Sequence, residues 1–158
     1  MGIVQVIEGR RVFEHLTVEE NLRVGAHLRK SGSVKERLEL VYRYFPRLRE
    51  KRNEVSGFVS GGEQQMLCMC RTLMGDPELI MIDEPTEGLA PKVVEQVGEL
   101  LQEIASRGVA ILLVEQKLTI ALRISHRLYV MGHGQIVYEG TPDSLLQADD
   151  VRREWLEV

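Results

Sequence analysis

Three short apolar runs stand out against an otherwise mixed pattern of hydrophobic and polar positions. They cover residues 3–7 (Ile-Val-Gln-Val-Ile), 79–83 (Leu-Ile-Met-Ile-Asp) and 109–114 (Val-Ala-Ile-Leu-Leu-Val), and each has the length of one buried strand. Between the second and third runs, residues 91–107 carry apolar side chains at helical spacing. The order of strand, helix and strand predicts a βαβ unit, and therefore a parallel sheet with a right-handed crossover.

The long segment between the first two runs is predicted to be mainly helical. Thr17 is followed three residues later by Glu20, which is the pattern of a capping box at the start of a helix. Residues 35–52 place apolar side chains on roughly one helical face, and Pro46 marks a kink or a boundary near the end of that stretch. We therefore expect residues 15–75 to form a helical subdomain.

The rest of the chain, residues 76–158, is expected to hold the second and third strands, a hairpin and a terminal helix. Residues 127–131 and 135–139 flank Gly132-His133-Gly134, which is a hairpin pattern. Residues 143–156 have a helical pattern. The chain shows no internal repeat and no low-complexity segment.

Composition and charge narrow the classes of function. The chain is 44% hydrophobic and 28% charged, which is enough apolar material for a core. Its net charge is −4, and the basic cluster in residues 47–52 is interrupted by Glu50, so a nucleic-acid partner is not expected. Because no apolar run approaches the ~20 residues of a membrane-spanning helix, we expect a soluble, cytoplasmic protein, in which any membrane association is through a partner.

The first motif with candidate chemistry is Ser60-Gly61-Gly62-Glu63-Gln64-Gln65, at the start of a predicted helix. The two glycines allow a ligand to approach the backbone closely, and the helix start directs free N–H groups and a positive dipole end outward. Such a turn is a candidate anion site. Taken alone, Ser-Gly-Gly is also a common turn.

The second motif is the apolar run that ends in Asp83-Glu84-Pro85. A carboxylate at the C-terminal end of a buried strand can hold Mg²⁺, directly or through water. A second carboxylate beside it can polarise an attacking water. Alone, this run also fits a strand that ends in a polar turn, and it is the combination of both motifs that favours a functional site.

Together, the two motifs resemble those of the ABC-transporter ATPases. Ser60–Gln65 is similar to the ABC signature, and Leu79–Pro85 is similar to the Walker B motif. Four further segments resemble the LivF-type subunit of branched-chain amino-acid importers, from its Q-loop region to its switch strand: residues 6–13, 16–22, 88–91 and 113–116. The resemblance spans essentially all 158 residues.

The resemblance implies an α/β, P-loop NTPase-like fold, with an incomplete parallel sheet and a mainly helical signature subdomain. It implies ATP and Mg²⁺ as cofactors, a homodimer or a homologous ABC ATPase as partner, and a membrane-embedded transporter subunit. In such a dimer the signature contacts the γ-phosphate of ATP held by the opposite subunit. The implied site residues are Ser60, Gly61, Gly62 and Glu63 at the nucleotide, Asp83 at Mg²⁺, Glu84 as catalytic base, Glu8 in the Q-loop and Gln116 at the switch.

Three residues depart from the most common ABC pattern. Glu8 stands where most members have glutamine, Ala90 where most have aspartate, and Gln116 where most have the switch histidine. The LivF-type pattern commonly shows such replacements. Gln116 cannot titrate as a histidine can.

The phosphate-binding pattern G-x-x-x-x-G-K-[ST] does not occur in the 158 residues. That loop supplies backbone N–H groups and a lysine to the phosphates, so we expect the chain alone not to hold ATP. Three hypotheses stay open. The chain is part of an importer ATPase, or a partner that lends its signature in trans to an intact ATPase, or an ABC-derived interaction module without a nucleotide role.

The same resemblance predicts how one strand edge is covered. In the ABC fold, the strand leading into the phosphate loop lies between the strands that correspond to residues 109–114 and 127–131. An uncovered apolar edge is a template for pairing with another strand. We therefore expect residues 109–114 to pair either with residues 127–131 or with a second copy of the chain.

Overall fold

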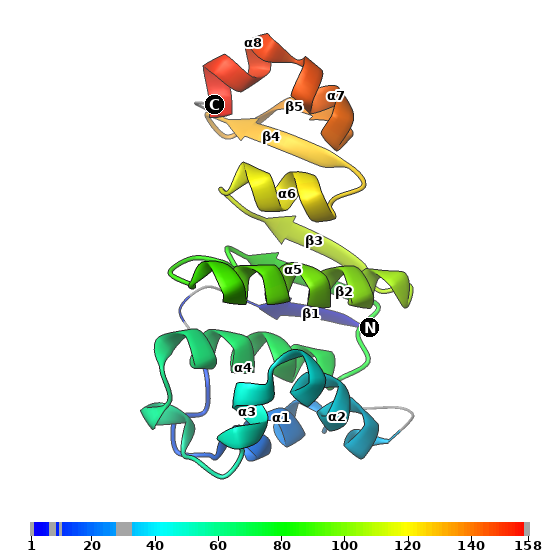
Figure 1. Cartoon of the computed structure of the whole chain (residues 1–158). Coiled ribbons are helices and arrows are strands. Elements are labelled where there is room, and N and C mark those ends of the chain that lie inside the picture. Colours follow the sequence, from blue (N-terminus) through cyan, green and yellow to red (C-terminus); the bar gives the residue numbers. More distant parts are fainter. Residues whose placement is uncertain (1, 7–8, 10, 28–32, 157–158) are drawn as a thin grey trace. The chain divides into compact units, whose positions relative to one another are not determined.

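A computed structural model describes residues 2–6, 9, 11–27 and 33–156 (Figure 1). The chain divides into two compact units, Met1–Val114 and Glu115–Val158, each with its own sheet. The first unit contains β1 (Ile3–Val6), α1 (Val18–Gly25), α2 (Val34–Tyr44), α3 (Pro46–Glu50), the 3₁₀ turn η1 (Ser56–Phe58), α4 (Gly61–Leu73), β2 (Leu79–Asp83), α5 (Pro91–Ser106) and β3 (Ala110–Val114). The second contains α6 (Leu118–Ile124), β4 (Leu128–Gly132), β5 (Gln135–Gly140), α7 (Pro142–Gln147), α8 (Asp149–Val151) and the π-helical turn η2 (Arg152–Leu156).

The first unit is built on a parallel sheet with the strand order β1-β2-β3. Leu79 of β2 pairs with Ile3 of β1 and with Ala110 of β3, so β2 is the central strand. α5 connects β2 to β3 and lies along the sheet (Figure 1), and its buried apolar residues are Val97, Leu100, Leu101 and Ile104. These features confirm the predicted βαβ unit and the α/β fold class with a parallel sheet.

Within the described residues, β3 is an edge of this sheet. Its residues Leu112 and Val114 are 52% and 54% exposed. β4 pairs with β5 in a separate antiparallel sheet, so the predicted pairing of residues 127–131 with residues 109–114 is wrong. The alternative cover, a second copy of the chain, stays a prediction.

The hairpin predicted in the second unit is confirmed. β4 and β5 are joined at His133 and Gly134, which have positive φ angles of 49° and 76°, as a type I′ hairpin turn requires. The inner face of this hairpin packs on α7, and the buried residues of the cluster are Leu128, Val130 and Leu145. The second unit thus has an apolar cluster of its own.

The tail is helical, as the pattern of residues 143–156 predicted, but it is not one continuous helix. The chain forms α7, α8 and η2 in succession. The interruption falls at Ala148, whose ψ of 70° lies outside the helical region. Trp155 of η2 meets the ring of His133 edge-on, with 5.3 Å between the ring centroids, so the tail packs on the hairpin turn.

Local sequence signals explain the helices that follow β1. Thr17 caps α1: its hydroxyl accepts a hydrogen bond from the Glu20 N–H, and the Glu20 carboxylate accepts one from the Thr17 N–H. This confirms the predicted capping box. α2 and α3 are separate helices, because Phe45 precedes Pro46 and leaves the helical region (φ −125°, ψ 76°). Pro46 is therefore a helix boundary and not a kink.

A buried asparagine fixes the turn that leads into α4. Asn21 is fully buried; its Oδ1 accepts a hydrogen bond from the Phe13 N–H at 2.9 Å, and its Nδ2 donates to the Ser56 Oγ at 2.8 Å. The Ser56 N–H in turn donates to the Leu16 carbonyl at 2.9 Å. These bonds satisfy polar groups in the interior of the helical region, and so they fix η1 relative to α1.

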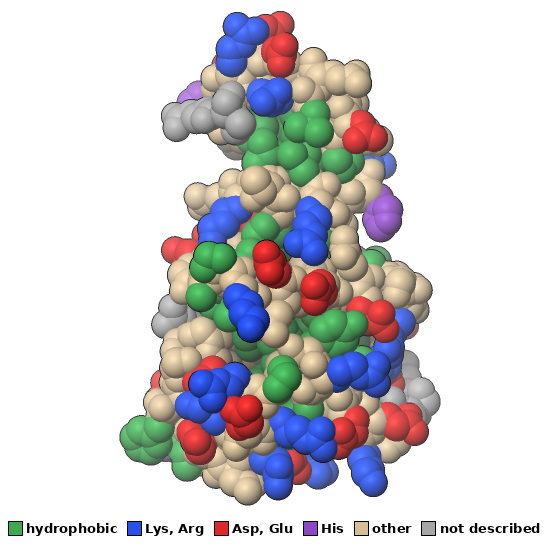
Figure 2. Space-filling model, in the orientation of Figure 1, with side chains coloured by type: hydrophobic (Ala, Val, Ile, Leu, Met, Phe, Trp, Pro, Cys, Tyr) green, Lys and Arg blue, Asp and Glu red, His purple; other side chains and the backbone are tan. Residues whose placement is uncertain are grey.

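Charged side chains cover the helical part of the first unit. Figure 2 shows basic and acidic groups intermixed there on the face that it draws. Ion pairs on this surface include Arg23–Glu19, Arg47–Glu50 and Arg49–Glu39. Among the described residues, no helix has the length and apolar character needed to cross a membrane.

Candidate functional site

The first candidate motif forms the N-terminus of α4. Ser60 is the N-cap residue with an extended backbone, and Gly61 and Gly62 are the first two helical residues. The Glu63 N–H donates to the Ser60 Oγ at 3.3 Å, and the Gln64 N–H donates to the Ser60 carbonyl at 2.9 Å. The N–H groups of Gly61 and Gly62 come before the first intrahelical bond and therefore point out of the helix end. The turn thus presents backbone donors and a positive dipole end.

The carboxylate of Glu63 completes a capping box with Ser60. One oxygen, Oε2, accepts hydrogen bonds from the Ser60 N–H and from the Ser60 hydroxyl, both at 2.8 Å. The Lys51 ammonium lies 3.2 Å from the same oxygen. Burial opposes ionisation of Glu63, but the hydrogen bonds from Ser60 and Lys51 outweigh burial and lower its pKa. The Ser-x-x-Glu spacing was a signal that could have predicted this box.

The second candidate motif lies at the C-terminal end of the central strand. Asp83 is the last residue of β2 and pairs in register with Val114 of β3. The Glu84 N–H donates to the Val114 carbonyl at 2.9 Å, which extends the ladder by one residue. Glu84 has a φ of +42°, a left-handed conformation that costs a non-glycine residue roughly 1 kcal/mol. The strand therefore leads directly into a strained residue, which is itself a predicted site position and the start of a tight turn.

The segment after this strand reaches the signature turn. The Glu87 N–H donates to the Glu84 carbonyl and the Leu89 N–H to the Thr86 carbonyl, both at 3.3 Å. A β-carbon placed on Gly62 would lie 3.5 Å from Leu89 Cδ2. The two motifs are thus neighbours within the first unit, linked by the compact turn that begins at Glu84.

Two predicted site residues belong to neither of these two motifs. Gln116 follows β3 by two residues and belongs to the second unit, next to Lys117, whose N–H donates to the Glu115 carboxylate at 3.0 Å. Glu8 lies outside the described residues. The structure therefore gathers Ser60, Gly61, Gly62 and Glu63 in one turn and Asp83 and Glu84 at one strand end.

The carboxylates at the strand end suit a metal ion that is also bound by a phosphate ligand. They suit less well a metal ion held by protein side chains alone. Among the described residues, no group of three or more histidine, cysteine, aspartate or glutamate side chains is placed to hold a metal ion. Asp83 and Glu84 are consecutive and partly exposed. Mg²⁺ is usually held by one or two carboxylates together with substrate phosphates, so these residues suit Mg²⁺ that arrives with a nucleotide.

Comparison with known families identifies the group to which these motifs belong. The profile of the family described as ABC transporter matches residues 2–87, which include both motifs. The chain belongs to the ABC transporter family. This assignment confirms the resemblance drawn from Ser60–Gln65 and Leu79–Pro85.

Curated ABC transporter relatives match nearly the whole chain. BraG of Pseudomonas aeruginosa, a high-affinity branched-chain amino acid transport ATP-binding protein, is 42% identical over 155 residues, which cover 98% of the chain and 66% of BraG. LivF of Archaeoglobus fulgidus, named as a probable branched-chain amino acid transport ATP-binding protein, is 36% identical over 93% of the chain and 63% of its own length. LivG of Escherichia coli is 32% identical over 99% of the chain and 68% of its own length. The chain therefore spans about two thirds of the length of these relatives.

Solved structures show the same ABC transporter fold. An ATP-binding subunit of an ABC transporter superposes with a TM-score of 0.82 at 27% identity, over 99% of this chain and 65% of the other. A nucleotide-free ATP-binding cassette superposes with a TM-score of 0.77 at 24% identity, over 99% of this chain and 68% of the other, which is a likeness of fold.

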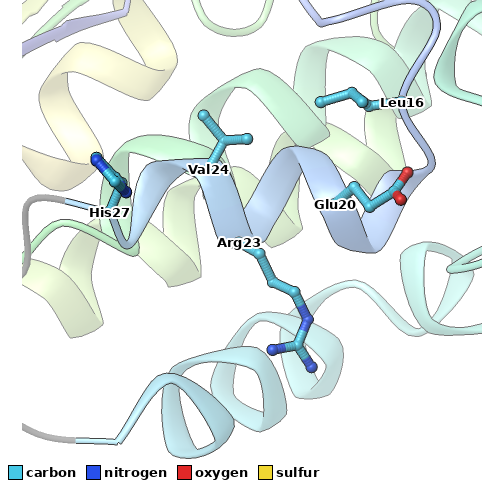
Figure 3. A pocket seen from close by; sticks show the side chains of 5 residues that line it. All are labelled: Leu16, Glu20, Arg23, Val24 and His27. Atoms are coloured by element: carbon cyan, nitrogen blue, oxygen red, sulfur yellow. The ribbon is translucent and has the colours of Figure 1, made fainter.

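An open pocket of about 470 Å³ lies along α1 in the helical region of this ABC transporter chain. Figure 3 shows the residues that line it: Leu16 before the helix, Glu20, Arg23 and Val24 on α1, and His27 after it. The pocket therefore combines apolar and charged side chains on one helix. Sequence patterns did not single it out, because its residues come from the capping and surface positions of α1.

Proposed function

We propose that this chain is the signature- and Walker B-bearing part of an ATP-hydrolysing subunit that powers the import of branched-chain amino acids. The names of relatives that are 42% and 36% identical support the transported solute. The observation that carries the proposal is the pair of outward N–H groups at Gly61 and Gly62. The Ser60–Glu63 box holds this pair beside the segment that follows Glu84.

In this proposal the two motifs serve different nucleotides. Ser60, Gly61 and Gly62 contact the γ-phosphate of ATP in the opposite subunit, where the helix end favours an anion. Asp83 holds Mg²⁺, and Glu84 is the catalytic base for the site of its own subunit. Mg²⁺ neutralises charge on the phosphates when it is bound. Glu8 and Gln116 take the Q-loop and switch positions, as the family pattern suggests.

A second candidate function is donation of the signature in trans to an intact ATPase. The 158 residues hold no G-x-x-x-x-G-K-[ST] sequence, so we propose that they bind ATP weakly by themselves. The signature turn, in contrast, is fully formed by contacts within the chain. That completeness favours a chain able to lend its signature to another subunit.

The proposed partners are a second ABC ATPase subunit and a membrane-embedded transporter subunit, on the cytoplasmic side of the membrane. We propose residues 15–75 as the signature subdomain of this assembly. The pocket on α1 offers the membrane subunit an apolar contact at Val24 with charged side chains at its rim. Arg23 at this rim is paired with Glu19 at 2.7 Å.

The proposal is tested by the association of the chain with an intact relative. The relative carries arginine at its own signature serine and glutamine at its Walker B glutamate, so that it retains ATP and cannot pair productively with itself. Fluorescence anisotropy of the labelled chain should show tighter association with Mg²⁺–ATP than with Mg²⁺–ADP, because only ATP offers the γ-phosphate. Equal association with both nucleotides would instead support an interaction module without a nucleotide role.

Donation of the signature in trans is tested by a second experiment, which measures ATP turnover. The relative then keeps its Walker B glutamate and carries only the signature change, and the chain should restore ATP turnover. Calorimetry of the chain alone should show no saturable micromolar binding of ATP. Micromolar binding would overturn the expectation that these 158 residues lack a phosphate cradle.

A further inference from the structure

Lys51 reaches the signature turn from the loop that follows α3. Its ammonium lies 3.2 Å from Glu63 Oε2 and 3.6 Å from Glu54 Oε2. The side chains of Lys51 and Glu63 are only 27% and 17% exposed. A pair shielded in this way is screened less by solvent than an open surface pair. The contact therefore couples the loop after α3 to the first turn of α4.

The Ser60 hydroxyl has one proton, and Glu63 holds it. The hydroxyl donates to Glu63 Oε2 at 2.8 Å, while its oxygen accepts from the Glu63 N–H at 3.3 Å. A hydroxyl carries a single donor, so in this arrangement Ser60 offers no proton to a phosphate. To bind phosphate as a donor, Ser60 must rotate this proton away from Glu63, and Oε2 then loses one of its donors.

The charge of Glu63 poses a second difficulty for an incoming anion. Its carboxylate lies in the first turn of α4, where the N–H groups of Gly61 and Gly62 point outward. An uncompensated negative charge there repels a phosphate and offsets the favourable helix end. The positive charge of Lys51 at 3.2 Å offsets that repulsion.

We propose that Lys51 is a positioning residue for the signature turn: it holds and neutralises the Glu63 carboxylate, so that the Ser60 hydroxyl can turn its proton to a phosphate oxygen. This inference rests on the proposed contact between the signature and the γ-phosphate. The lowered pKa of Glu63 agrees with it, because the Lys51 contact is one of its causes.

Neighbouring basic side chains have different partners. Among the described residues of α3, Arg47 is paired with Glu50 at 2.8 Å, and Arg49 is paired with Glu39 at 3.4 Å. Arg49 thus carries the same charge as Lys51 and lies close to it in the chain, but it pairs with a different carboxylate. It provides the matched control for loss of one positive charge.

The test measures ATP-dependent association of the full chain with the hydrolysis-deficient relative described above. Lys51→Met should weaken association roughly fivefold in ATP, as expected for one charge at a partly exposed site, and leave association in ADP unchanged. Lys51→Arg should restore it. Arg49→Met should match the unchanged chain. In a Glu63→Gln background, Lys51→Met should have no further effect, because no carboxylate is left to neutralise.

A second measurement reads the contact without nucleotide. Carboxyl ¹³C NMR of the chain alone should show the pKa of Glu63 rise when Lys51 is replaced by methionine. No change in that pKa would overturn the inference. The inference would also be overturned if Lys51→Met weakened association in ATP equally in the wild-type and Glu63→Gln backgrounds. Provided that the unchanged chain still associates more tightly in ATP than in ADP, that result would leave the proposed function intact. If the unchanged chain shows no preference for ATP, both fail together.

Discussion

The two candidate motifs are held by different kinds of interaction. Every bond described above for the turn at Ser60 comes from residues within a few positions, apart from one ion pair from Lys51. The end of β2 depends on distant partners: Asp83 pairs with Val114, and the Glu84 N–H donates to the same residue's carbonyl. The signature half of the site is thus a local structure, whereas the Walker B half is a product of the sheet.

The two halves also differ in backbone strain. Ser60 has ordinary N-cap angles (φ −60°, ψ 155°), whereas Glu84 is held at a φ of +42°. A strained residue persists only when its surroundings determine its conformation. The signature turn is therefore preorganised by its own sequence, and the geometry at Glu84 is only as secure as the pairing of β2 with β3.

The largest expected effect separates the two halves by the nucleotide that each serves in the proposed function. Ser60→Arg should abolish ATP-dependent association and any restored turnover, a loss of more than about 100-fold, because a bulky side chain fills the space of the phosphate and removes the cap. Glu84→Gln should change either property less than about twofold, because in the proposed function Glu84 serves the site of its own chain. Titration with the modified relatives measures both. Equal losses would reject a signature that acts across the dimer.

The features predicted from the sequence are those set by local signals. Thr17–Glu20 was recognised as a capping box, and the start of α4 at Gly61 followed from the Ser-Gly-Gly pattern. The apolar run ending at Asp83 identified β2 for the same reason, since strand length and period are local properties. Helix starts and strand identities therefore needed no knowledge of the third dimension.

Features set by tertiary contacts were missed. The positive φ of Glu84 depends on its bond to Val114, which is far away in the sequence, and no residue type at this position signals it. Lys51 gave no sign of its contact with Glu63, because a basic residue near the end of a helix is usually solvated. The pairing predicted between residues 127–131 and 109–114 was wrong, because β4 and β5 form a sheet of their own.

A second prediction concerns η1, the turn that precedes the signature half in the chain. Asn21→Ala removes the buried side chain that bonds Phe13 and Ser56, so it should lower the free energy of unfolding by about 2–4 kcal/mol. Urea unfolding followed by circular dichroism measures this loss. Asn53→Ala, at an exposed asparagine in the same region, should change it by less than about 0.5 kcal/mol. A small effect at Asn21 would mean that η1 is fixed by other contacts.

A third prediction compares the stability contributed by the N-cap at Ser60 with the stability lost to backbone strain at Glu84. Ser60→Ala should lower the free energy of unfolding by about 1 kcal/mol, because the N-cap hydroxyl is lost. Glu84→Gly should be more stable than Glu84→Ala by about 1 kcal/mol, because glycine adopts positive φ without strain. Both alanine and glycine remove the carboxylate, so their difference isolates the backbone. Urea unfolding gives all three values, and a glycine variant no more stable than the alanine variant would show that Glu84 is not strained.

The smallest expected effect is on how the stability of the chain changes with pH, when the wild type is compared with Glu63→Gln, a variant without the carboxylate of the signature turn. Burial opposes ionisation of Glu63, yet the bonds from Ser60 and Lys51 lower its pKa below the ordinary value of 4.5. A lowered pKa in the folded state stabilises the fold fully above the unfolded value, and that stabilisation is lost as the pH falls through the folded value. The wild-type chain should therefore lose more stability between about pH 5 and pH 3 than Glu63→Gln, which keeps a hydrogen-bond acceptor and does not titrate. The midpoints of urea unfolding across that pH range measure the difference. Glu84→Gln, which removes one carboxylate from the other half of the site, is the control for the loss of a carboxylate. Parallel pH profiles for wild type and Glu63→Gln would show that the capping carboxylate contributes nothing to the stability of the turn.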